Sequence, residues 1–105
     1  MSSGRLVVSE EAEADLDSIA AYIAEYDGRL RAITIADRIR KAMDSLAFMP
    51  GMGGRRYYLK RNQRAFSVSP WTIFYEELPE REGINVVRVV DGRRNLPAIF
   101  GKKNR

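Results

Sequence analysis

The sequence predicts an α+β domain of two layers, in which an N-terminal helical hairpin packs on an antiparallel β-sheet. Two stretches with helical apolar periodicity come first in the chain, and short strand-like stretches follow them. Consecutive strands with short links pair antiparallel. The hairpin has to bury two apolar stripes, and the sheet is the only surface large enough to cover them. The chain has 105 residues, so we expect residues 1–105 to form a single domain without internal repeats.

The first helix is predicted to begin after Ser9, whose side chain is a typical N-cap. Glu10 and Glu11 follow in the first turn, where carboxylates interact favourably with the helix dipole. The helix is expected to end at Asp27–Gly28, because glycine readily adopts the positive φ of a helix terminus. Its apolar residues recur at helical spacing along one face: Ala12, Leu16, Ile19, Ile23 and Tyr26.

A second helix is predicted to run to about Phe48, where Pro50 and the glycines around it stop the helical pattern. The break between the two helices is only about as long as residues 27–28, and so short a link implies an antiparallel helical hairpin. The apolar stripe of this second helix consists of Ala32, Ile33, Ala36, Ile39, Met43 and Leu46.

The remainder of the chain is predicted to form strands, because it is rich in β-branched and aromatic residues between turn signals. Residues 84–90 are apolar on both faces, which predicts a central strand. Residues 95–100 form a short apolar segment, and residues 101–105 are expected to be a flexible tail. The expected strands, including the short one before the first helix, are residues 5–8, 55–60, 65–68, 71–76 and 84–90.

The composition excludes several classes of protein. The chain has no cysteine, which removes disulfide frameworks and thiolate metal sites. It has no histidine, which removes the commonest general base and the commonest metal ligand. We therefore expect neither a metal nor a cofactor. No apolar run approaches the roughly 18 residues that a membrane span needs, and the N-terminus lacks the apolar core of a signal peptide. A cytoplasmic location without membrane contact is the simplest expectation.

Charge is distributed unevenly along the chain. Residues 1–50 carry six Lys/Arg and nine Asp/Glu, whereas residues 51–105 carry twelve Lys/Arg and five Asp/Glu. A basic C-terminal half favours a polyanionic or acidic partner. The alternative is that this charge serves only solubility.

Four segments in this order resemble the RelE/ParE toxin superfamily of type II toxin–antitoxin systems, and ParE most closely. They are Ala12–Tyr22 in the first helix, Leu46–Gly53 at the end of the second, Thr72–Tyr75 in the penultimate strand and Arg88–Leu96 at the end. The resemblance covers nearly the whole chain. It implies the same α+β fold that the periodicity predicts.

The last of these segments is the one that bears on the target. In ParE-like chains the final strand ends in a segment similar to R-V-L-H-G-R-R-D. Here Asp91 stands where histidine is frequent and Asn95 stands where aspartate is frequent. The resemblance implies that Arg93, Arg94 and Asn95 contact the target. The alternative for Arg93 and Arg94 is a pair of solvated charges after a turn.

Resemblance to ParE implies a toxin that inhibits DNA gyrase and thereby replication, without being an enzyme. Such a protein binds the gyrase–DNA complex and blocks the resealing of cleaved DNA. The basic C-terminal half supplies electrostatic contacts for binding the gyrase–DNA complex. Inhibition of this kind requires no catalytic side chain. The tail adds further cationic residues, Lys102, Lys103 and Arg105.

Resemblance to RelE implies the alternative function, a ribosome-dependent mRNA endonuclease. Lys, Arg and Tyr side chains can replace histidine in such a reaction. The main catalytic candidates are Lys60, Arg61, Arg88 and Tyr75, although a tyrosine at the position of Tyr75 is more often a core or rim residue than a catalytic one. Phe100, near the end of the chain, has no ionisable group, which weighs against this alternative. The wider set of candidates adds Arg56, Arg64 and Tyr58.

A toxin of this superfamily implies an antitoxin partner, here a ParD-like protein encoded beside it, with which it forms a hetero-oligomer. The tail of such an antitoxin is expected to be acidic and amphipathic and to fold on binding. Aromatic residues dominate binding hot spots, so the candidate antitoxin contacts are Tyr22, Tyr57, Tyr58 and Trp71. A generic nucleic-acid-binding module is a weaker alternative, since only interleaved Arg and aromatic residues support it.

Overall fold

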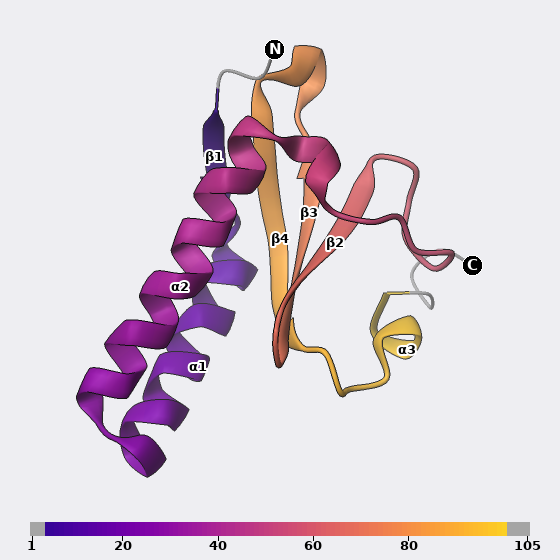
Figure 1. Cartoon of the computed structure of the whole chain (residues 1–105). Helices are drawn as coiled ribbons and strands as arrows, with labels where there is room; N and C mark the ends of the chain where they lie inside the picture. Colours follow the sequence, from indigo (N-terminus) through magenta and orange to yellow (C-terminus); the bar gives the residue numbers. More distant parts are fainter. Residues whose placement is uncertain (1–3, 101–105) are drawn as a thin grey trace.

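The computed structural model describes residues 4–100. A helical hairpin lies against one face of a β-sheet, and both helices run past one end of the sheet (Figure 1). The predicted α+β class and the packing of the hairpin on the sheet are confirmed. The tail at 101–105 that we expected to be flexible lies outside the described residues. In chain order the elements are β1 (Arg5–Val8), α1 (Glu10–Asp27), α2 (Arg29–Phe48), η1 (Pro50–Met52), β2 (Gln63–Val68), β3 (Trp71–Glu77), η2 (Pro79–Arg81), β4 (Gly83–Asp91) and α3 (Leu96–Phe100).

The sheet is mixed, with the strand order β1-β4-β3-β2. The consecutive strands β2, β3 and β4 pair antiparallel as predicted, and β4 occupies the predicted central position. The expectation of an antiparallel sheet is wrong for β1, which pairs parallel to β4. Short links make consecutive strands pair antiparallel, but β1 is not joined to the next strand by a short link. The whole helical hairpin follows β1 and forms the long crossover connection that parallel pairing requires. Gly83 opens β4 at a φ of +148° directly against the backbone of Arg5, where a side chain would collide.

The strand predicted at residues 55–60 does not form. The backbone makes only an isolated bridge between Gly54 and Ala65, and then leaves the sheet through turns to Gln63. Tyr58 within this segment is buried against the face of the sheet that the hairpin leaves open. The aromatic and apolar residues that predicted a strand here therefore reflect packing on the sheet instead of pairing within it.

Gly28, with a φ of 93°, is the only residue between α1 and α2. The Ser9 hydroxyl accepts a hydrogen bond from the Ala12 amide at 3.1 Å, which confirms the predicted N-cap. The apolar stripes are confirmed along the part of the hairpin that covers the sheet. They are wrong at Tyr26 and Ile33, both exposed near the tip of the hairpin.

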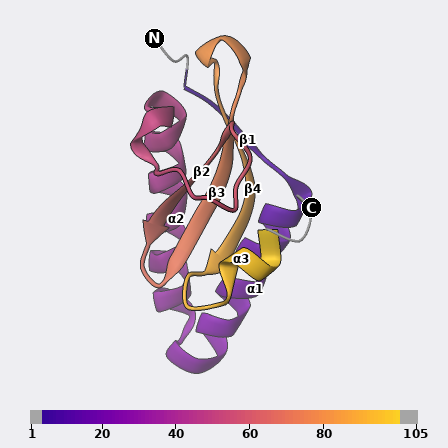
Figure 2. The same ribbon diagram turned by 90° about the vertical axis from the view of Figure 1, so that its right-hand side faces the viewer.

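The outer face of the sheet carries a second, smaller core. Figure 2 views this face and shows the loop after η1 and the helix α3 lying across it. The rings of Phe74 and Phe100 lie with their centroids 4.2 Å apart within this layer. The predicted two layers are thus joined by a partial third. The buried members of this second core are Tyr58, Ala65, Phe74, Val90 and Leu96.

Candidate functional site

A hollow of about 310 Å³ lies between α1 and the end of the sheet. It brings together two residues predicted to contact an antitoxin, Tyr22 and Trp71, and one predicted to contact the target, Arg93. Tyr22 projects from the part of α1 near the overhanging tip and is 65% exposed, whereas Trp71 opens β3 and is half-buried. The remaining lining residues are Ser18, Ile19 and Asp91. We call these six residues the α1 groove.

Asp91 holds Arg93 in a defined position. One carboxylate oxygen of Asp91 accepts hydrogen bonds from the Arg93 amide and Nε, both at 2.9 Å, and the other accepts one from Nη2 at 2.6 Å. The Arg93 side chain nevertheless remains 78% exposed. The hydrogen bonds from Arg93 hold the pKa of the Asp91 carboxyl at about 2, below its ordinary value of 3.8. The guanidinium is therefore both oriented and presented to solvent.

The basic turn after β4 is anchored at both ends. The Gly92 amide donates to the carbonyl of Pro70 at 2.7 Å, which ties the turn to the connection between β2 and β3. Asn95, predicted to contact the target, accepts a hydrogen bond from the Ala98 amide at 3.4 Å and so caps α3. Arg94, between these anchors, is exposed. A second hollow of about 290 Å³ shares Trp71 and Arg93 with the α1 groove and extends to Arg56 and Leu96.

The other two predicted antitoxin contacts, Tyr57 and Tyr58, line neither of these hollows. Tyr57 is 89% exposed and meets the Tyr58 ring edge-on, at a centroid distance of 5.2 Å. Tyr58 is only 8% exposed, and its hydroxyl accepts a hydrogen bond from Arg56 at 3.0 Å. The Tyr58 ring is therefore covered within the chain itself, whereas Tyr57 presents a free aromatic surface.

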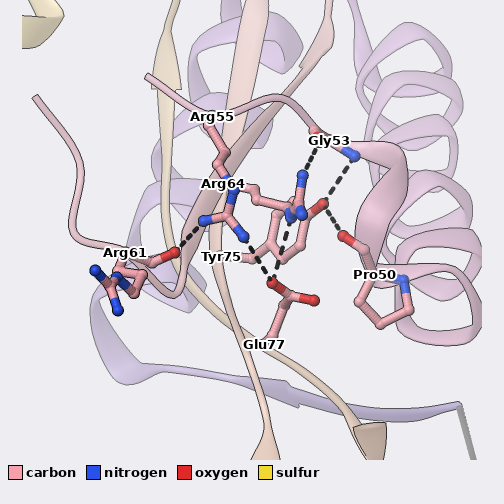
Figure 3. Close-up of polar contacts among 7 residues, drawn as sticks. All are labelled: Pro50, Gly53, Arg55, Arg61, Arg64, Tyr75 and Glu77. Atoms are coloured by element: carbon pink, nitrogen blue, oxygen red, sulfur yellow. Dashed lines mark hydrogen bonds and ion pairs between the residues drawn. The ribbon is translucent and has the colours of Figure 1, made fainter. Parts of the chain in front are cut away.

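Tyr75, a candidate for the ribonuclease alternative, is a core residue that holds the segment after α2. Its ring is fully buried, and its hydroxyl donates to the Pro50 carbonyl at 2.5 Å and accepts from the Gly53 amide at 2.9 Å (Figure 3). Gly53 has no side chain, and a Cβ there would collide with the Tyr75 hydroxyl. Burial raises the pKa of the Tyr75 phenol, while the Gly53 hydrogen bond and Arg64 lower it by less. The phenol is neither accessible to a substrate nor poised to act as a base.

Charged residues near the Tyr75 hydroxyl hold the segment between η1 and β2 in place. Arg64 donates to the Gly53 carbonyl at 2.9 Å and to the Glu77 carboxylate at 3.3 Å, as Figure 3 shows. Arg55 forms an ion pair with the same carboxylate at 3.9 Å and donates to the carbonyl of Arg61. These contacts fix the path of the chain between η1 and β2.

Arg88 is also engaged inside the structure. It binds Asp15 of α1 through two hydrogen bonds, Nε to Oδ2 at 2.7 Å and Nη2 to Oδ1 at 3.1 Å. Asp15 additionally accepts the Val89 amide at 2.9 Å. The hydrogen bonds with Asp15 raise the pKa of the Arg88 guanidinium. Arg88 thus joins β4 to α1.

The ribonuclease candidates are only partly brought together. Lys60 and Arg88 line one hollow of about 130 Å³ beside Gln63 and Glu11. Arg61 is exposed, outside the residues that line this hollow, and Tyr75 lies in the core. The described part of the chain contains no group of three or more carboxylates that could hold a metal ion. Within residues 4–100, no helix is long and apolar enough to cross a membrane.

Sequence reasoning missed the acidic partners at both arginine sites, Asp15 and Asp91. Each stands inside a segment that carried the family resemblance, but a single sequence does not reveal which arginine pairs with which carboxylate. It also missed the role of Gly53, which looked like part of a helix stop.

Comparison with known proteins decides the family. The sequence model described as "ParE toxin of type II toxin-antitoxin system, parDE" matches residues 6–96. The chain belongs to the ParE toxin family. It is 33% identical over 100 residues to Toxin ParE3 of Caulobacter vibrioides, an alignment that covers 95% of this chain and 98% of the relative.

A solved structure supports the fold of this ParE-family chain. The structure is described as "Chromosomal ParDE TA system from P. aeruginosa" and superposes with a TM-score of 0.71 at 20% identity. The match covers 85% of this chain and 96% of the other. The predicted resemblance to ParE is therefore confirmed, and a toxin of this family implies an antitoxin partner.

Proposed function

We propose that this ParE-family toxin inhibits DNA gyrase, and thereby replication, and that a ParD-like antitoxin neutralises it. The observation that carries the proposal is the basic turn at the end of the central strand. There Arg93 is oriented by Asp91 yet largely exposed, and Arg94 is exposed beside it. Two neighbouring exposed arginines, of which Arg93 is held in a defined position, suit a contact with a nucleoprotein complex, because arginine forms planar charge-assisted hydrogen bonds with phosphate and carboxylate groups.

The geometry of the ribonuclease candidates favours gyrase over the alternative of ribosome-dependent mRNA cleavage. A general base has to reach the proton that it abstracts. The Tyr75 phenol is buried with both hydrogen-bonding positions occupied, and Arg88 is engaged by Asp15. Lys60 and Arg61 remain the accessible members of the set. A non-enzymatic poison requires none of these side chains to act chemically.

The proposed antitoxin is an acidic, amphipathic protein that associates with this chain in a hetero-oligomer. Exposed aromatic rings at Tyr22 and Tyr57 and the half-buried Trp71 offer anchors of the kind that dominate interfaces. We place the protein in the cytoplasm, where both gyrase and a co-expressed antitoxin would meet it.

Two assays on the same preparation separate the candidate targets. The protein is added to gyrase with supercoiled plasmid and ATP, and cleavage complexes are trapped with detergent and protease. In parallel, primer extension on a ribosome–mRNA complex detects cuts. We expect linear plasmid that increases with dose and no codon-positioned cuts. Codon-positioned cuts without linear plasmid would replace the gyrase proposal with the ribonuclease one.

A further inference from the structure

We propose that the toxin associates with a second copy of itself through the solvent face of α2, with the two α2 helices antiparallel. The α2 solvent face consists of exposed residues on the side of the helix that turns away from the core: Leu30, Ile33, Asp37, Lys41 and Phe48. None of these residues lines the α1 groove or belongs to the turn after β4. The inference therefore stands apart from the proposed target and the proposed antitoxin.

Large apolar side chains are exposed at both ends of α2. Leu30 near its start is 81% exposed, and Phe48 at its end is 62% exposed. The two residues are eighteen positions apart, which is about five turns, so they project from the same side of the helix. Ile39, midway between them, is fully buried on the opposite side. A partner that runs along α2 would cover both exposed ends at once.

An ion pair lies between these apolar ends. Asp37 and Lys41 are both exposed and form an i,i+4 pair at 3.4 Å. The point midway between Leu30 and Phe48 along the helix is also midway between Asp37 and Lys41. An antiparallel second copy that places its Phe48 over Leu30 therefore places its Lys41 over Asp37. Two-fold symmetry repeats both contacts, so that the four charges alternate around the axis.

The surface relief of α2 fits the same arrangement. A hollow of about 360 Å³ on the α2 solvent face is lined by Ile33, Thr34, Asp37, Arg38 and Lys41. The last four are spaced i, i+3, i+4 and i+7, so they surround one point of the helix surface, as the four residues of a hole do in knobs-into-holes packing. The antiparallel register brings Lys41 of the second copy over this hollow. Its methylene groups pack there while its ammonium reaches Asp37.

This self-complementarity identifies the occupant as a second copy of the chain. A symmetric interface has to carry both halves of every contact on one surface, and the α2 solvent face carries Leu30 with Phe48 and Asp37 with Lys41. One helix of 20 residues against another makes a small interface, and small interfaces belong to weak, transient associations. We therefore expect a dissociation constant on the order of 10 μM.

Sedimentation equilibrium tests self-association of the full chain, purified without any partner protein. Concentrations run from about a tenth to about ten times the expected dissociation constant. We expect the average mass to rise from the monomer value of 12.0 kDa toward twice that value. A mass that stays at the monomer value throughout, or one that rises beyond that of a dimer, would overturn the proposal.

Charge-swap variants test the register of the two helices. Asp37→Lys and Lys41→Asp each bring like charges together across the dimer, and we expect each to weaken self-association about tenfold or more. The double variant Asp37→Lys/Lys41→Asp restores opposite charges and is expected to recover most of the wild-type affinity. Both side chains are exposed, so the fold should be unaffected, which circular dichroism verifies. Single variants that associate like wild type would overturn the register.

Leu30→Glu tests the apolar end of the α2 solvent face. It replaces the contact with Phe48 by a carboxylate, and is expected to weaken self-association about tenfold. The matched control is Tyr57→Glu, which introduces the same carboxylate at a side chain that is 89% exposed on the loop before β2. We expect the control to associate like wild type. An equal loss in both variants would show that any added negative charge disrupts the dimer, and would overturn the role of Leu30.

Disulfide trapping tests the direction of the helices, because the chain has no cysteine of its own. Asp37→Cys and Lys41→Cys proteins are mixed and oxidised. In the antiparallel register a disulfide joins the two introduced thiols, while the Asp37–Lys41 contact on the other side of the axis remains intact. We expect mass spectrometry to find the mixed dimer enriched beyond the proportion that random pairing gives. A random proportion, or an excess of either cross-linked homodimer, would overturn the antiparallel pairing.

Discussion

Asp15 of α1 binds Arg88 of β4 through two hydrogen bonds of 2.7 and 3.1 Å, and accepts the Val89 amide as well. β1 ends at Val8, paired with Val86, so beyond this point β4 has no strand on that side. Beyond Val86, two side chains provide the hydrogen-bond partners of this edge. The Ser9 hydroxyl donates to the Val87 carbonyl at 3.1 Å, and the Asp15 carboxylate accepts from the Val89 amide. The start of α1 therefore satisfies the open edge of the central strand.

This relationship predicts that Asp15→Ala destabilises the protein by about 2 kcal/mol, since it removes hydrogen bonds to a charged group and leaves the Val89 amide without its partner. Thermal unfolding followed by circular dichroism measures the effect. Asp17→Ala, an exposed carboxylate on the same helix, is the matched control and is expected to change stability little. Equal melting temperatures for the two variants would contradict the structural role of Asp15.

Tyr75→Phe separates structure from catalysis at the buried phenol. The substitution removes the acceptor of the Gly53 amide and the donor to Pro50, which is expected to cost about 1–3 kcal/mol. Activity per folded molecule should stay at the wild-type level, because the phenol does not reach the surface. Denaturant unfolding and the plasmid assay give the two quantities. Wild-type stability combined with lost activity would instead make Tyr75 a functional residue.

Gly53→Ala tests the close approach of the chain to Tyr75 from the other side. A Cβ at this position collides with the Tyr75 hydroxyl and lies 2.9 Å from the Ala65 carbonyl. Overpacking of this kind is expected to cost about 1–3 kcal/mol. Gly51→Ala is the control, since a Cβ there meets nothing within 4 Å. Gly53→Ala should melt at a lower temperature than Gly51→Ala. A lower melting temperature for Gly51→Ala would contradict the close contact between Gly53 and Tyr75.

The Asp91 carboxyl gives a prediction in pH. Hydrogen bonds from Arg93 lower its pKa from 3.8 to about 2. A lowered pKa means that the contact contributes its full stability above the ordinary value and loses it as pH falls from about 4 toward 2. Carboxyl ¹³C NMR titration should place Asp91 near 2 in wild type and move it back toward 3.8 in Arg93→Gln. An unchanged value in the variant would show that Arg93 does not hold the carboxylate.

Local patterns predicted what depends on local chemistry. Ser9 capped α1 as expected, and Leu16 and Ile39 are buried, because helix caps and apolar periodicity are set by neighbours in sequence. The same periodicity failed at Tyr26 and Ile33, since it cannot tell where the covering sheet ends. The parallel pairing of β1 was missed because it depends on a partner more than seventy residues away.

The sequence named candidate residues for the site but did not predict which of them the fold brings together. The sequence pointed to Arg93 and Trp71 separately, and the fold brought them into one groove. Arg88 and Tyr75 were candidates for reactive side chains in the ribonuclease alternative, since a sequence does not disclose that Asp15 binds Arg88 and that the Pro50 carbonyl accepts from Tyr75. Tyr58 was expected at an interface, and its exposure depends on where the loop from 55 to 62 packs.

The most direct test of the account compares two double variants in the gyrase cleavage assay. Arg93→Ala/Arg94→Ala removes the basic turn, and Lys60→Ala/Arg61→Ala removes the accessible pair of the ribonuclease set. All four side chains are exposed, so both proteins should fold, which circular dichroism verifies. We predict that linear plasmid is lost with the first variant and retained with the second. Retention of linear plasmid without Arg93 and Arg94, or its loss without Lys60 and Arg61, would contradict the assignment of the toxic contact to the turn after β4.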